Sequence, residues 1–335
     1  MNSFSVGDLA HTYTLQRRSA ALKTQMSHLG NELSTGQISD KRAVFSANID
    51  HIMDIEADLK ALEGYKVAVT EATQFSQAVQ IALERVDTSV GNLATTLFAM
   101  SPHATEPVME QFSAEAEAEL TTIVSALNTK LGGRFLFSGK ATDRPALADV
   151  SNILDGLRDA VVGATTIEEI STRANAWFNS TSGFTSAVYS GDISELSGFR
   201  LSKGEVVHVQ TTANSQVFRD TIKHIAIAAI SSDPALGLDI NDQRTLMQDA
   251  GKRLFDSRTD LTALRGTIGS AQSRIDVVST RNSNKESALM MTKAALLSAD
   301  PFEAATKLEA VQFQLQSLYT VTAKMAEMSF LNYMR

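Results

Sequence analysis

Two long tracts without proline constrain the fold of this chain more than any other feature. The first runs from Ala43 to Ser101 and the second from Asn241 to Met291. Apolar residues recur along both at steps of three and four, the spacing of helices that pack lengthwise. In the first tract they are Val79, Leu83, Val86, Val90, Leu93 and Leu97. A continuous helix over that tract would be about 85 Å long, so we predict a mainly α fold built as a long antiparallel helical rod.

Both ends of the chain carry similar apolar stripes. Asp300, Pro301 and Glu303 are typical of a helix start, with Asp as N-cap and Pro at the first helical position. Ser19 and Thr322 occupy stripe positions that an apolar residue would complete. The N-terminal stripe comprises Leu15, Leu22, Met26, Leu29 and Leu33, and the C-terminal stripe Leu308, Val311, Leu315, Leu318 and Met325. We predict two terminal coiled-coil helices that lie together.

The last turn of the chain stays apolar almost to its final residue. Met328, Leu331 and Tyr333 lie where monomeric proteins usually end in polar, frayed residues. Burying one such side chain is worth about 1.5 to 3 kcal/mol, so an exposed end would forfeit several times that. A partner chain is therefore expected to cover it. Together with the two stripes, Met328 and Leu331 complete the set of residues predicted to form a subunit interface.

The middle of the chain differs from both tracts. Ten of the 18 glycines lie between Gly132 and Gly237, with the single Trp. The segment "GFRLSKGEVVHVQT" reads as two strands joined at Lys203-Gly204. We predict a small mixed α/β outer domain inserted into the helical rod. The predicted order is a coiled-coil segment at 1–42, outgoing helices at 43–131, the inserted domain at 132–240, a returning helix at 241–298 and a final helix at 299–335.

The stretch "LGGRFLFSGKAT", residues 131–142, looks like a phosphate-binding loop but lacks its spacing. Five residues separate Gly133 from Gly139, and Ala141 follows Lys140 where a metal-binding hydroxyl is required. The sequence favours a short strand or hairpin that closes a helix. Its alternation would place Phe135 and Phe137 on one face and Leu136 on the other.

Composition and motifs indicate no catalytic chemistry. Cysteine is absent, and the net charge of −8 offers no basic stripe for a nucleic acid. No segment reaches transmembrane length, and the start lacks the features of a cleaved signal peptide. A calcium-like segment from Asp239 has Arg244 where the turn requires Gly. We predict no enzyme, no cofactor and no metal site; the six histidines are scattered, at His11, His28, His51, His103, His208 and His224.

Four segments, in order, resemble the bacterial flagellin superfamily over nearly the whole chain. They are "LSTGQISD", "LGGRFLFSGK", "LTALRGTIGSAQSRID" and "EAATKLEAVQFQLQSLYTVTAKMAEMSFLNYM". Within the superfamily, "GRFLFSG" and "MSFLNYM" are most similar to the hook-associated branch that joins hook to filament. The run from Ile38 to Ala43 departs from that branch, which commonly has an acidic pair and a proline there. Filament flagellin is therefore the alternative within the superfamily.

The resemblance implies a structural protein of the flagellum. Its terminal helices would pack against other copies of the chain in a ring, with the inserted domain facing outward. Its neighbours would be a preceding hook-associated protein on the hook side and flagellin on the filament side. Export through the flagellar type III channel, without a cleaved signal peptide, and a cytoplasmic chaperone on the C-terminal helix are also implied. A coiled-coil binding or signalling module is the alternative of a different class.

Overall fold

The computed structural model describes residues 6–39, 41–194, 196–209 and 211–333. The chain divides into two compact units. One comprises Met1–Glu63 with Ser283–Arg335, and the other comprises Gly64–Asn282. Two long helices, α2 (Lys41–Phe98) and α8 (Ile240–Leu296), contribute residues to both units.

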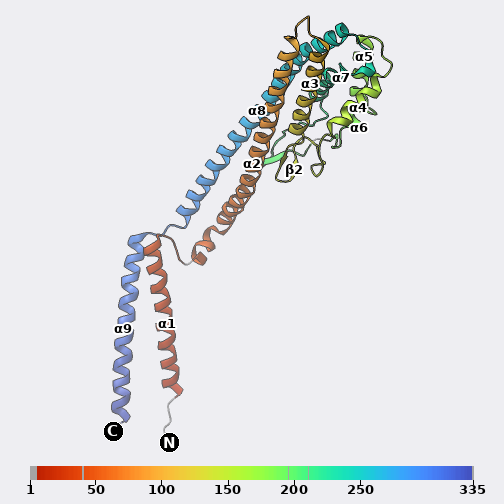
Figure 1. Ribbon diagram of the computed structural model, residues 1–335. Helices are drawn as coiled ribbons and strands as arrows, with labels where there is room; N and C mark the ends of the chain where they lie inside the picture. Colours follow the sequence, from red (N-terminus) through yellow and green to blue (C-terminus); the bar gives the residue numbers. More distant parts are fainter. Residues whose placement is uncertain (1–5, 40, 195, 210, 334–335) are drawn as a thin grey trace. The chain divides into compact units, whose positions relative to one another are not determined.

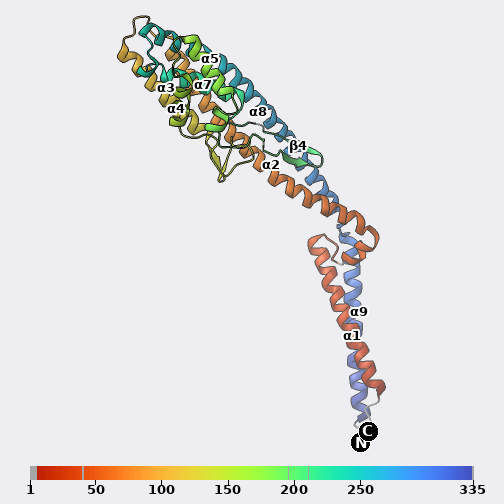
Figure 2. The same cartoon turned by 90° about the vertical axis from the view of Figure 1, so that its right-hand side faces the viewer.

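The first unit contains helices from both ends of the chain. Helix α1 (Val6–Thr35) lies beside α9 (Pro301–Tyr333), and the two run antiparallel (Figures 1 and 2). In the same unit, Lys285 and Lys293 of α8 form ion pairs with Asp58 and Glu56 of α2, each at 2.7 Å. Such exposed pairs contribute little to stability, but they show which turns of the two helices lie side by side.

In the second unit, α2 and α8 pack antiparallel along their lengths. The side-chain amide of Gln80 donates to the carbonyl oxygen of Arg265 at 2.8 Å. Arg258 donates to the half-buried carboxylate of Asp87 at 3.0 Å. The predicted antiparallel pair of long helices is therefore confirmed.

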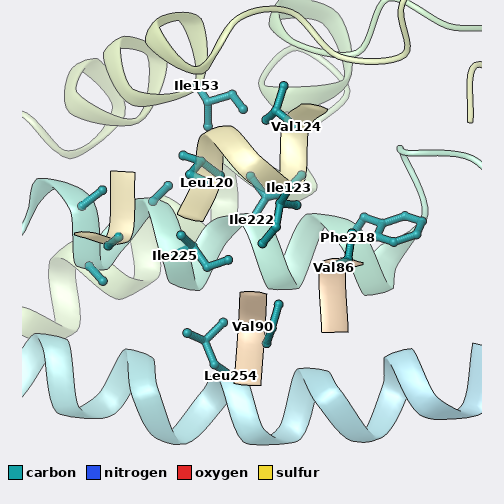
Figure 3. Packing of buried hydrophobic residues seen from close by; sticks show 14 of the residues in the cluster. Val86, Val90, Leu120, Ile123, Val124, Ile153, Phe218, Ile222, Ile225 and Leu254 are labelled. Atoms are coloured by element: carbon teal, nitrogen blue, oxygen red, sulfur yellow. The ribbon is translucent and has the colours of Figure 1, made fainter. Parts of the chain in front are cut away.

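Five shorter helices complete the second unit. They are α3 (Glu106–Leu127), α4 (Val150–Val161), α5 (Ile167–Asn179), α6 (Phe184–Ala187) and α7 (Gln216–Ile230), with a 3₁₀ turn at Pro234–Leu236. Helix α7 is buried on nearly all sides. Figure 3 shows its side chains between those of α3 and those of α2 and α8; the labelled residues include Leu120, Ile123, Phe218, Ile222, Ile225, Val86, Val90 and Leu254. This core anchors the inserted segment to the long helices.

Two hairpins supply the strands of the described residues. In the first, β1 (Lys130–Leu131) pairs with β2 (Arg134–Phe135), and both turn glycines have positive φ, as a tight two-residue turn requires. In the second, β3 (Phe199–Ser202) pairs with β4 (Glu205–Val207) across the predicted turn. Their buried Leu201 and Val207 pack on α2 and α8. The mainly α class with a small mixed insert is confirmed, whereas the five segment boundaries stay predictions.

One expectation for the first hairpin is wrong. Leu136 does not face away from Phe137, because both belong to the main core, whereas Phe135 is buried without belonging to it. Strand β2 ends at Phe135, and the chain then bends, so the period of two no longer applies. Leu136 and Phe137 both enter the main core, where the Phe137 ring meets Phe218 edge-on at 5.8 Å.

Candidate subunit interface on the terminal helices

The stripes predicted at the two ends of the chain meet along α1 and α9. Leu22, Leu29 and Val311 are buried between the helices. Met26, Leu308, Leu315 and Leu318 pack partly buried around them. The structure therefore brings seven of the twelve predicted interface residues together, as a seam within one chain.

The remaining predicted residues differ in their surroundings. Leu15 and Met325 are half-buried, and neither belongs to the seam cluster. Leu33 is 44% exposed although it follows the same spacing. The side chains of Met328 and Leu331 lie outside the described part of the structure. Among the described residues, the seam thus uses the middle of the N-terminal stripe and the first four residues of the C-terminal stripe.

Backbone hydrogen bonds join the segment that follows α1 to the segment that precedes α9. Ala299 N donates to Gly36 O at 2.9 Å, and Ile38 N donates to Leu297 O at 2.8 Å. Gly36 has a φ of +68°, which suits the residue just beyond the end of α1. The carboxylate of Asp300 accepts from Phe302 N at 2.8 Å, confirming the predicted N-cap of α9. These bonds fix where α1 ends and α9 begins.

Ser19, the polar residue in the N-terminal stripe, takes part in a polar contact with Tyr319 of α9. Hydrogen bonds from Lys23 and from Ser19 lower the pKa of the Tyr319 hydroxyl below its usual value. The Lys23 ammonium also lies 5.9 Å from the centre of the Tyr319 ring, within cation–π range. A polar contact between α1 and α9 therefore takes the position that an apolar residue would fill, and it helps to define their register.

The face of α9 opposite the seam carries large exposed aromatic residues. Phe302 is 83% exposed and Phe313 is 71% exposed. They are separated by about three turns of helix, and each lies about 180° to 200° around the axis from Val311. Val321 is also exposed on α9, as is Tyr13 on α1. The sequence prediction did not include these residues, because it followed one apolar stripe along each helix. Large aromatic residues that lie off this stripe are the sequence signal for a second contact face.

In the structure, a backbone hydrogen bond engages the loop at residues 131–142. In the loop that resembles a phosphate-binding motif, Lys140 N donates to Ser194 O at 3.1 Å instead of facing an open cradle. Within these same residues, no three His, Asp or Glu side chains gather as metal ligands would. None of the helices described has the length and apolar character that crossing a membrane requires.

Comparisons with known proteins bear on the fold of this chain. Residues 254–334 match the family model of the bacterial flagellin C-terminal helical region. A search of the curated proteins finds no match to this sequence. A solved structure, assigned as a flagellar hook-associated protein from Vibrio parahaemolyticus, has 15% sequence identity and a TM-score of 0.54. The likeness covers 73% of this chain and 95% of that chain. This chain has the fold of that hook-associated protein and carries, in residues 254–334, a segment of the flagellin C-terminal type.

Proposed function

We propose that this protein is a structural subunit of the bacterial flagellum, acting as the junction between a preceding hook-associated protein and the flagellin filament. The observation that carries the proposal is the paired terminal helices, whose outer face is aromatic and uncovered, in a chain with the fold of a hook-associated protein. Isolated monomers rarely keep large aromatic side chains exposed in line on one helix, so this face fits an assembly contact.

The proposed mechanism is selective association rather than catalysis. One face of each subunit would contact a different face of the next, and such head-to-tail contacts close into a ring when the rotation allows it. The seam from Leu22 to Leu29 with Val311 would hold each helix pair together. Phe302 and Phe313 would then contact neighbouring copies, and Leu15, Leu33 and Met325, which continue the seam side of the pair, would make a second set of contacts.

Immunogold electron microscopy of flagella from the source cells tests the junction role. Label confined to one band between hook and filament is the expected result. Label along the whole filament would instead assign the chain as filament flagellin, the candidate favoured by the match at residues 254–334. Flagella without any label would contradict both and favour a coiled-coil signalling module. Cells that lack the protein should carry hooks without filaments.

A pair of adjacent substitutions tests the proposed outer contact. Phe313→Ser removes an exposed aromatic side chain and should leave the melting temperature of the monomer unchanged, because little area is buried there. It should nevertheless reduce filament attachment strongly. Gln314→Ser, at an exposed polar neighbour, should leave attachment intact. Equal motility of the two variants would contradict a role for this face.

The proposal includes binding of a chaperone before the subunit is exported and assembled. An aromatic face on α9 would need cover inside the cell, so we propose that a cytoplasmic chaperone binds it before flagellar export. Purified chaperones of the export system should bind the full chain and bind the Phe302→Ser/Phe313→Ser variant more weakly. Equal binding of both proteins would place the chaperone contact elsewhere.

A further inference from the structure

A polar cleft opens in the second unit between α5 and α8, with α7 as its floor. It consists of two adjoining hollows of about 290 and 440 Å³ that share Ser171, Thr172, Asp249 and Arg253. These volumes lie at the lower end of the range of small-molecule sites. Its floor also includes the buried apolar Ile227, so both polar and apolar surfaces face the space.

One wall of the cleft presents hydroxyls that the protein does not use. Helical Ser and Thr side chains in this chain commonly donate to the carbonyl four residues earlier, as Thr245 on the opposite wall does to Asn241 at 2.8 Å. The side-chain hydroxyls of Ser171 and Thr172 on α5 have no hydrogen-bond partner among the described residues. Each hydroxyl is left free to donate one hydrogen bond and to accept others.

The floor of the cleft adds further unused hydrogen-bonding capacity. Lys223, whose side chain is 9% exposed, donates to Asp220 at 2.7 Å and to Asn175 at 3.0 Å. Two of its three donors are thereby occupied. The neighbouring His224 has no hydrogen bond within the described residues, and burial, with Lys223 and Arg253 nearby, lowers its pKa to about 4. At neutral pH the ring is uncharged and offers one donor and one acceptor.

The charges around the cleft are balanced. Arg253 forms an ion pair with Asp249 at 2.8 Å at the rim, and Lys223 is paired with Asp220 on the floor. A phosphate would lack an uncommitted arginine, and a metal ion would lack a free group of carboxylates. The outer hollow also has two exposed charges of opposite sign, Glu168 and Lys252, with no ion pair among the described residues. Nearer the floor, the free groups are neutral hydroxyls and an imidazole. Such groups complement the alternating donors and acceptors of a sugar, while Ile227 can cover its C–H face.

We propose that this cleft binds a neutral hydroxylated molecule of monosaccharide size, through Ser171, Thr172 and His224. A free sugar and the terminal residue of a longer glycan present the same hydroxyls to these groups. The proposal concerns the second unit alone and is independent of the junction role.

Histidine NMR on the full-length protein tests this site directly. The probes are the methyl glycosides of glucose, galactose and N-acetylglucosamine. At least one should shift the His224 ring signals in a saturable manner and leave the other five histidines, none of which lines the cleft, unchanged. Oligosaccharides that end in the same sugar residue then distinguish the two ligand sources. If they bind more tightly than the methyl glycoside, the natural ligand is a glycan end; if they do not bind, it is the free sugar. A response to inorganic phosphate alone, equal shifts of all six histidines, or no shift at all would overturn the proposal.

Substitutions in the α5 wall test whether the His224 shifts arise from binding in the cleft. Ser171→Ala with Thr172→Val should weaken binding roughly tenfold, because two hydrogen-bonding groups are lost. Thr121→Val, at an exposed position of α3 outside the cleft, is the control and should bind normally, since that hydroxyl bonds its own helix. Thr172→Trp, at an exposed position, should block the cleft without unfolding the protein. Undiminished binding by both cleft variants, with unchanged melting temperatures, would also overturn the proposal.

Discussion

At the scale of single residues, Gly139 occupies a position that excludes any side chain. Its φ is +61°, and a Cβ there would lie 2.2 Å from Asp192 O and 2.6 Å from Ser194 O. Gly139→Ala should therefore lower the free energy of unfolding by about 2 to 4 kcal/mol, through backbone strain and a forced shift of the facing loop. Gly132→Ala is the control, since its φ is +57° and nothing lies within 4 Å. Equal losses in urea unfolding would contradict the steric explanation.

The ionised carboxylate of Glu205 should make the stability of the folded protein depend on pH. Hydrogen bonds from Arg281, and secondarily from Arg274, lower the pKa of its carboxyl in the folded protein. This contribution to stability is present above the usual glutamate pKa of about 4.3 and is lost as the pH falls through the lower folded value. Glu205→Gln should thus lower the urea midpoint at pH 7 and have less effect near pH 3. Glu117→Gln, an exposed carboxylate on α3, should show no such difference.

At the scale of elements, two glycines of α8 differ in what they face. A Cβ on Gly251 would lie 3.0 Å from Leu97 Cβ and 3.2 Å from Phe98 N, so this glycine permits close packing against α2. Gly266 has nothing within 4 Å. Gly266→Ala should raise the free energy of unfolding by about 0.5 to 1 kcal/mol through better helix propensity. Gly251→Ala should lower it, because neither facing atom can rotate away. A gain in stability from both would contradict close packing at Gly251.

Long elements were predictable from the sequence, whereas their outer faces were not. The apolar periodicity places the two long helices within a few residues of Lys41–Phe98 and Ile240–Leu296, because one repeated contact governs many residues. The same repeat says nothing about Phe313, which lies opposite the seam. The seam itself joins α1 to α9 of one chain, and a periodic stripe does not state which helix covers it. Ser171 and His224 come together only through the packing of three helices, which local spacing does not encode.

At the scale of the whole molecule, the two units have separate apolar cores. The large core and the hairpin core lie within Gly64–Asn282, and the seam of α1 and α9 lies outside that range. Deleting residues 301–335 should leave the melting temperature of the second unit unchanged. The loss of helical circular dichroism should exceed the 33 residues of α9, because the 30 residues of α1 lose their partner and an isolated helix is marginal in water. Unfolding of the second unit on this deletion would contradict two separate cores.

The antiparallel pairing of α1 and α9 also determines how the pair responds to force. The beginning of α1 and the end of α9 lie at the same end of the pair, and the backbone bonds of Gly36 and Ile38 close the other end (Figure 1). Tension applied between those two open ends loads the contacts one layer at a time, as in a zipper, rather than all at once in shear. The pair should therefore separate at low force when pulled from its ends, and yet resist sliding along its axis, where every seam contact must break together.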